Sequence, residues 1–273
     1  MIREMLSYPF LVRALAGGIM VSLCASLLGV SLVLKRYSMI GDGLSHVSFG
    51  ALSVALAVGW SPLPVSIPVV TLAAFFLLRI TENGKVKSDA AIAMISASAL
   101  AIGIVATSLT TGMTTDVSSY MFGSILAMSR EDVFLSAVLS IIVLCLFVFS
   151  YNKVFAVTFD ENFARATGVR VGRYNVLIAV LTAVTIVLGM RMMGAMLISS
   201  LIIFPALTSM RIFKSFRGVI LSSGVLSVVC FCIGMTVSYR LSTPAGASVV
   251  LVDLAAFGLF TFFSLVRRIA CRK

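Results

Sequence analysis

The hydrophobic and polar positions of this chain alternate in long blocks, not from one residue to the next. Apolar runs reach about 20 residues, the length of a helix that crosses a bilayer, and short stretches rich in charge separate them. The strands of a membrane β-barrel would instead alternate apolar and polar residues. The pattern therefore predicts an all-α polytopic membrane protein with eight or nine transmembrane helices. The expected spans are 10–34, 41–59, 63–80, 89–111, 131–151, 174–191, 194–210, 218–239 and 247–266.

Composition agrees with this pattern. The chain is 60% hydrophobic and 11% charged, whereas a soluble domain carries about 25% charged residues. Segment 112–130 is too polar for a free span and too apolar for a plain loop, which predicts a short re-entrant or interfacial helix. With no appended soluble stretch or repeat, we expect residues 1–273 to form a single transmembrane domain.

The formal net charge of +11 would suggest nucleic acid in a soluble protein. Here the cations gather between the apolar runs, so the positive-inside rule is the better account and no nucleic-acid partner is expected. Placing the N-terminus outside puts most loop cations inside. The expected inside cations are Lys35, Arg36, Arg79, Lys85, Lys87, Lys153, Arg165, Arg170, Arg173, Arg211, Lys214, Arg217, Arg267, Arg268, Arg272 and Lys273.

The stretch KRYSMIGDGLSHVSFG, residues 35–50, carries the most distinctive chemistry. Asp42 and His46, the only histidine, would lie one helical turn apart on the same face. A carboxylate and an imidazole suit Zn²⁺ or Mn²⁺, and ionisable groups at membrane depth favour a functional role. Alternatively, Asp42 is a first-turn acid that favours the helix N-terminus, and His46 is hydrogen-bonded between helices.

Two other features have weaker claims to bind metal. Asp253 lies in the last apolar run, where a buried acid more often pairs with a cation such as Arg240 or faces a cavity. Thioethers gather at Met190, Met192, Met193 and Met196. Soft sulfur suits Cu(I), but we expect packing because methionine fills irregular gaps.

The basic loop at 152–173 contains a pattern typical of a short amphipathic helix. Asp160 can cap its start, Glu161 suits its first turn, and Gly168 suits the left-handed position after its end. Phe163 and Ala164 would then present an apolar knob to a partner. An ordinary surface helix between two spans is the alternative.

Several motifs together resemble the permeases of metal-ion ABC transporters for zinc, manganese or iron. The segment at 35–50, the YMFGSIL segment, VLGMRMMGAMLISSLIIFPALTS and the capped helix occur in this order and at similar spacing, over nearly the whole chain. The most specific piece is Asp-Gly-Leu-Ser-His after a basic pair. In the family this block commonly ends in an apolar residue, proline and glycine, whereas here Val47-Ser48-Phe49-Gly50 follows without proline.

The resemblance implies a permease dimer, homo- or heteromeric, of the vitamin-B12-importer-like type in the bacterial cytoplasmic (inner) membrane. The implied partners are a separate ABC ATPase subunit and an extracytoplasmic metal-binding protein. In that family the capped helix docks on the ATPase, which would give a coupling role to Asp160, Glu161, Phe163, Ala164 and Gly168. The chain has no G-x-x-x-x-G-K-[ST] motif, so ATP hydrolysis would fall to the separate subunit. Zinc, manganese or iron would be cargo, with no permanently bound cofactor.

Three other functions compete with a metal-ion permease. An ABC permease for a chelate such as a siderophore, haem or cobalamin would need a wide cavity and no ionisable ligand pair. A secondary cation carrier using Asp42 for proton coupling would need no coupling helix. A membrane-embedded zinc enzyme would need a second histidine or an H-E-x-x-H motif, and the sequence has neither.

Overall fold

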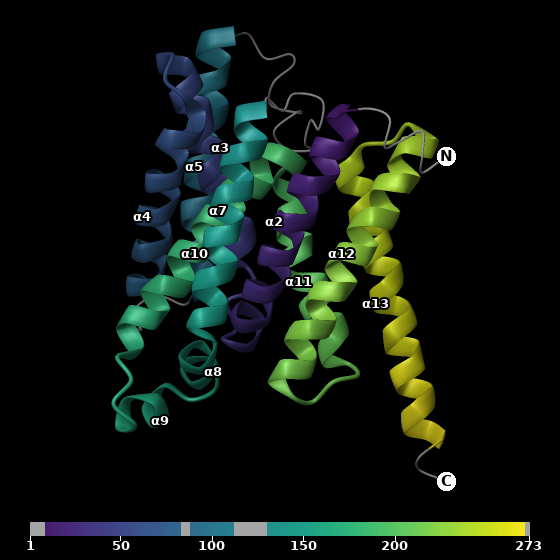
Figure 1. The fold of residues 1–273 in the computed structure, drawn as a ribbon. Helices are drawn as coiled ribbons and strands as arrows, with labels where there is room; N and C mark the ends of the chain where they lie inside the picture. Colours follow the sequence, from purple (N-terminus) through teal and green to yellow (C-terminus); the bar gives the residue numbers. More distant parts are fainter. Residues whose placement is uncertain (1–8, 83–87, 112–129, 271–273) are drawn as a thin grey trace.

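The computed structural model describes residues 9–82, 88–111 and 130–270. Every regular element among these residues is an α-helix, as the block pattern predicted (Figure 1). The helices are α2 (Pro9–Leu34), α3 (Ile40–Val58), α4 (Pro62–Glu82), α5 (Ser88–Thr111), α7 (Arg130–Phe149), α8 (Tyr151–Phe159), α9 (Glu161–Ala166), α10 (Val171–Met193), α11 (Ala195–Met210), α12 (Phe216–Leu241) and α13 (Ala245–Ala270).

Seven of the described helices are long and apolar enough to cross a membrane. Helices α7 and α8 meet at a 69° bend and make an eighth span if the pair is counted as one. The predicted ninth span, 194–210, is α11, whose 16 residues fall short of the roughly 20 that a bilayer requires. Eight is therefore the upper count by length among the described residues, which agrees with the lower of the two predicted numbers.

Two predicted segments between the spans differ from the structure or lie partly outside it. The stretch at 152–173 is not a loop, because most of it is helical: α8 runs on to Phe159, and α9 follows after Asp160. Its residues were assigned to a loop because their charges interrupt the apolar pattern. The predicted re-entrant helix at 112–130 lies outside the described residues, except that Arg130 begins α7.

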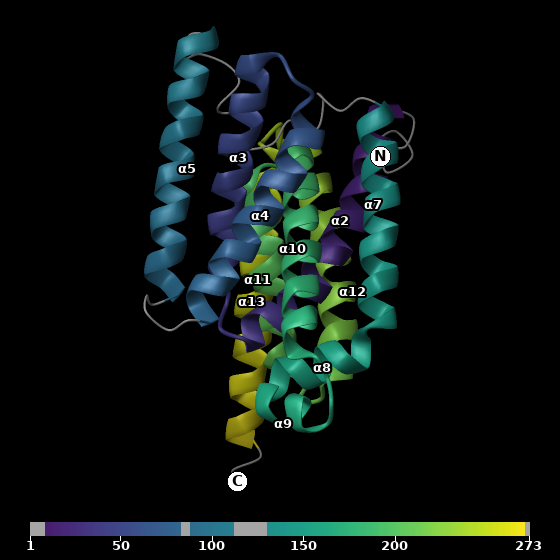
Figure 2. The same ribbon diagram turned by 90° about the vertical axis from the view of Figure 1, so that its left-hand side faces the viewer.

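Helices α2, α3 and α10 form much of the interior, while α5 and α13 lie at the periphery (Figures 1 and 2). The outer faces of these peripheral helices are strongly apolar, with Leu109 84% exposed and Leu259 69% exposed. An apolar surface of this extent is unfavourable in water and indicates contact with lipid or protein. The protein is thus a multi-pass helical membrane protein.

The connections at one end of the bundle agree with the sidedness predicted from charge. Lys35, at the end of α2, forms an ion pair with Glu161, at the start of α9. These two segments therefore lie on the same side, as expected of two inside loops. The far end of α13 lies toward the same end of the bundle as α8 and α9 (Figures 1 and 2).

Candidate functional site

The turn between α2 and α3 sets where the candidate metal-binding helix begins. Arg36 adopts a left-handed φ of 62°. The Arg36 N–H donates to the Val33 carbonyl over 3.1 Å, and the Tyr37 N–H donates to the Leu32 carbonyl over 2.8 Å. This is the Schellman arrangement that ends helices, here with arginine where glycine is usual. Helix α3 then starts at Ile40 with no side-chain cap from Met39.

Asp42 and His46 lie on the same face of α3, one turn apart, as predicted. The distance from Asp42 Oδ2 to His46 Nε2 is 3.8 Å, and the two side chains are 49% and 19% exposed. That distance exceeds a hydrogen bond. It is close to the roughly 3.4 Å that separates two ligand atoms bound about 2.1 Å from one tetrahedral ion. The pair can therefore face a shared cation, although Asp42 in the first turn also complements the helix N-terminus.

One chain supplies only part of a coordination shell at this pair. No group of three or more His, Cys, Asp or Glu residues converges among the residues that the structure describes. A structural zinc site uses four protein ligands. A nearby cavity of about 480 Å³ between α3, α4 and α5 is lined by apolar side chains such as Val47 and Ile102, and neither Asp42 nor His46 reaches it. That cavity has no ligands for a cation.

The glycines of α3 allow close helix packing within the chain. A Cβ on Gly43 would come within 2.6 Å of Ile92, and one on Gly50 within 2.6 Å of the Ala99 carbonyl oxygen, both on α5. Small residues at such crossings let backbones approach. For Gly43 and Gly50 the close neighbour is therefore α5 of the same chain.

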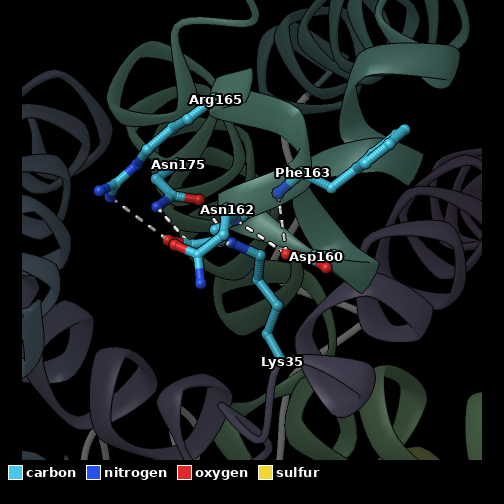
Figure 3. A network of polar contacts seen from close by, with 7 residues as sticks. Lys35, Asp160, Asn162, Phe163, Arg165 and Asn175 are labelled. Atoms are coloured by element: carbon cyan, nitrogen blue, oxygen red, sulfur yellow. Dashed lines mark hydrogen bonds and ion pairs between the residues drawn. The ribbon is translucent and has the colours of Figure 1, made fainter. Parts of the chain in front are cut away.

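Helix α9 has the end structure that the sequence predicted. Asp160 Oδ1 accepts hydrogen bonds from the N–H groups of Asn162 at 2.9 Å and Phe163 at 3.0 Å (Figure 3). Gly168 has a φ of 82°, and the Val169 N–H donates to the Ala164 carbonyl over 2.9 Å. Both caps are therefore confirmed, while the coupling role of α9 stays a prediction.

The predicted apolar knob on α9 is only half correct. Phe163 is 63% exposed and available to a partner, but Ala164 is fully buried and packs in a small cluster with Val157 and Val171. Ala164 points inward because the helix must cover the end of α8 and the start of α10. A direct partner contact through Ala164 is thus wrong, and its contribution is to hold α9 against the bundle.

A polar network at the start of α9 was missed by sequence reasoning. Lys35 Nζ donates to Glu161 Oε1 at 2.8 Å and also to Asn175 Oδ1, while Asn175 Nδ2 donates to Glu161 Oε1 at 3.2 Å (Figure 3). Arg165 lies 3.8 Å from the other oxygen of Glu161. Lys35 and Asn175 are 140 residues apart, so no local pattern could reveal the contact. Only the buried Lys35 side chain, 7% exposed, marks it as unusual.

The network changes the acidity of Glu161. Burial raises the pKa of this carboxyl. The hydrogen bond and charge of Lys35, the hydrogen bond from Asn175 and the charge of Arg165 together lower the pKa by more than burial raises it. The net pKa of Glu161 lies below its ordinary value. Glu161 is therefore ionised at neutral pH and holds Lys35 as a charged partner.

The two weaker metal candidates do not form a site in the described residues. Asp253 is 2% exposed, and its Oδ2 has no hydrogen-bond partner among those residues. Met190, Met192 and Met193 are buried in the core, as expected for packing, whereas Met196 is 48% exposed. The four thioethers thus do not share one environment.

The fold defines an integral membrane protein of many helices that carries the Asp42–His46 pair on α3. The chain belongs to the ABC 3 transport family, whose sequence profile matches residues 7–264. It is 30% identical to a probable iron transport system membrane protein of Haemophilus influenzae, with 97% of each chain covered. It is 29% identical to the manganese import system permease protein ScaB of Streptococcus gordonii, covering 97% of this chain and 95% of that protein.

A third relative and a solved structure extend the comparison. The chain is 27% identical to the high-affinity zinc uptake system membrane protein ZnuB of Haemophilus influenzae, covering 93% of this chain and 98% of that protein. Its fold matches a chain of PsaBC from Streptococcus pneumoniae, solved in complex with Fab, with a TM-score of 0.85, 29% identity and 95% of each chain covered. The likeness therefore extends over essentially the whole length.

Proposed function

We propose that this chain is the permease subunit of an ATP-driven importer that carries a divalent transition metal, zinc, manganese or iron. The observation that carries the proposal is the Asp42–His46 pair, 3.8 Å apart on one face of α3. It occurs in a chain whose full-length relatives are named for iron, manganese and zinc. The carboxylate and imidazole accept all three metals, so the pair does not select among them.

Two copies of the chain would complete the metal site. Each protomer offers one oxygen ligand and one nitrogen ligand, and a twofold axis beside α3 would bring four around one ion. Four oxygen and nitrogen ligands suit tetrahedral Zn²⁺, or Mn²⁺ and Fe²⁺ with added water. Asp42 offsets part of the ion's charge in a low-dielectric pathway, and the site must still release the ion. The homo- or heterodimer would have the helix arrangement of the vitamin-B12-importer-like type.

The partners follow from the same proposal. An ABC ATPase subunit would dock on α9 through the exposed Phe163 and hydrolyse ATP, since this chain contains no Walker motif. An extracytoplasmic metal-binding protein would deliver the ion from the other side of the bacterial cytoplasmic membrane. Asp160 and Gly168 would contribute by fixing the ends of α9, and Ala164 by anchoring it.

Alanine substitution on α3 tests the metal site. We expect Asp42→Ala or His46→Ala to lower ATP-dependent uptake of Mn²⁺, Zn²⁺ and Fe²⁺ at least 100-fold while leaving the amount of assembled dimer unchanged. In a homodimer either substitution removes two of the four ligands, one from each copy. Uptake is measured in proteoliposomes that contain the complete complex.

Ser48→Ala provides the matched control on the same helix. Its hydroxyl is buried without a hydrogen-bond partner among the described residues, so its removal leaves α3 and its packing in place. Wild-type uptake in both Asp42→Ala and His46→Ala would remove the metal-site proposal. Uptake that persists without the ATPase subunit would instead favour a secondary carrier.

A further inference from the structure

Lys35 lies where the end of α2, the start of α9 and the N-terminal part of α10 meet. It follows the last residue of α2, and its Nζ contacts Glu161, the first residue of α9, and Asn175, the fifth residue of α10 (Figure 3). Its side chain is only 7% exposed, whereas lysine is almost never buried unless it is paired. The structure thus keeps a buried cation at a place where a solvated lysine would be ordinary.

Backbone hydrogen bonds restrain the short segment between Lys35 and the Asp42–His46 pair. The N–H of Tyr37 donates to Leu32, the N–H of Ile40 donates to the Tyr37 carbonyl over 3.0 Å, and the N–H of Gly43 donates to Met39 over 3.0 Å. Tyr37 is thereby tied to both α2 and α3, and Met39 to α3. Asp42 is two residues beyond the start of α3. A displacement of the Lys35 side chain and backbone is therefore passed to the first turn of α3.

The other end of the contact is equally fixed. Glu161 is the first residue of a short helix whose start is capped by Asp160 and whose end is closed at Gly168. Ala164 anchors that helix in a buried cluster. Asn175 uses its amide oxygen toward Lys35 and its amide nitrogen toward Glu161, so α10 closes the network. Glu161 is ionised at neutral pH, which keeps the pair charged.

We propose that Lys35 is a positioning residue that couples α9 to the metal-binding end of α3 through its contacts with Glu161 and Asn175. The inference deepens the proposed function, since it takes α9 as the ATPase docking element and Asp42–His46 as the metal pair. Movement of α9 upon ATP binding displaces Glu161, and Lys35 transmits this displacement to the α2–α3 turn. Without the lysine, α9 moves but the start of α3 is no longer displaced with it.

The test measures metal ions carried per ATP hydrolysed in the reconstituted complex, with Mn²⁺ and Zn²⁺ as probes. Lys35→Met keeps the length of the side chain and removes its charge. We expect this ratio to fall at least tenfold, with ATPase turnover and the amount of assembled complex within about twofold of wild type. Lys35→Arg, which keeps the charge, should recover most of the ratio.

Lys153→Met is the matched control, because Lys153 lies on neighbouring α8 over the ring of Tyr174 and outside the network. It should keep the wild-type ratio. If Lys35→Met assembles poorly, Glu161→Gln tests the same ion pair, because it removes the charge of Glu161, the more exposed of the two partners. The double variant should lower the ratio no further than the larger single effect, because both changes break one connection.

The outcomes separate this inference from the proposed function. A wild-type ratio in both Lys35→Met and Glu161→Gln would overturn the inference. Equal losses of transport, ATPase turnover and assembly would also overturn it, because a residue that only stabilises the fold lowers all three together. In either case wild-type protein would still transport metal. If the wild-type complex itself carries no Mn²⁺ or Zn²⁺, the proposed function fails first.

Discussion

At the scale of single residues, the buried polar side chains of the described residues are mostly serines and threonines, and the ionisable groups differ in exposure. Asp42 and His46 keep partial exposure and a separation suited to a shared ion. Lys35 and Asn175 are instead nearly dry and mutually bonded. A buried charge persists only when paired, so the first pair is open to a ligand and the second set is closed. This difference supports the proposed metal binding on α3 and the proposed positioning role of the turn before it.

The ionised state of Glu161 gives a pH prediction at this scale. A carboxyl whose pKa is lower in the folded than in the unfolded state stabilises the fold above its unfolded pKa, and that contribution disappears as pH falls through the folded pKa. Glu161→Gln should therefore destabilise the protein by at most about 1 kcal/mol at neutral pH, since the pair is partly exposed. The difference in melting temperature should stay constant between about pH 6 and 8 and shrink below about pH 4.

Thermal unfolding of the wild type and Glu161→Gln in detergent, followed across pH, measures this difference. Lys153→Met serves as a reference for loss of a charge outside the network. If the difference in melting temperature between the two proteins changed steeply between about pH 6 and 8, Glu161 would not have the lowered pKa described above.

Two neighbours on α9 should respond in opposite ways. Ala164 is fully buried against Val157 and Val171, so Ala164→Leu overfills the cluster and should cost about 1–3 kcal/mol of stability. Phe163 is 63% exposed, so Phe163→Ala should leave the melting temperature nearly unchanged but weaken ATPase binding at least tenfold. Melting curves and co-purification with the ATPase subunit measure the two effects. ATPase binding that is insensitive to Phe163→Ala would exclude this face as the docking surface.

At the scale of elements, close backbone approach holds α3 against α5. Gly50→Ala places a Cβ within 2.6 Å of the Ala99 carbonyl oxygen, and backbone atoms cannot yield as a flexible side chain does. We expect a loss of about 1–3 kcal/mol, as for other overpacked sites. Gly258→Ala on α13 meets nothing within 4 Å and should gain about 1 kcal/mol from helix propensity. Melting temperatures of both variants check this, and equal stability would show that α3 and α5 separate freely.

The element scale also shows what could be predicted from the sequence. Long apolar runs determine the spanning helices, because bilayer thickness leaves few alternatives. The caps at Asp160 and Gly168 were predictable because they depend on neighbouring residues. The short α11 was counted as a full span because its composition is strongly apolar, although its 16 residues, Ala195–Met210, closely match the predicted bounds 194–210. The inward turn of Ala164 and the Lys35–Asn175 contact depend on packing between distant helices, which no local pattern encodes.

At the scale of the whole molecule, the apolar outer faces of α5 and α13 and the half-complete ligand set on α3 both require something beyond one chain. Lipid satisfies the first requirement. In the proposed dimer a second copy would satisfy the second, by doubling two ligands to four. The connection through Lys35 then lies on the same side as the exposed Phe163 of α9. The proposed ion site and the proposed docking helix thus lie on elements that the contacts of Lys35 join.

X-ray absorption at the zinc edge tests the central claim most directly. His46 is the only histidine in the chain, so any site with two imidazoles must draw on two copies. Zn²⁺ bound to the purified permease, prepared without a histidine tag, should show a shell of four oxygen and nitrogen ligands with scattering from two imidazole rings. Both signals should be lost in His46→Ala. Sulfur in the first shell, or a spectrum that is unchanged in His46→Ala, would contradict the account.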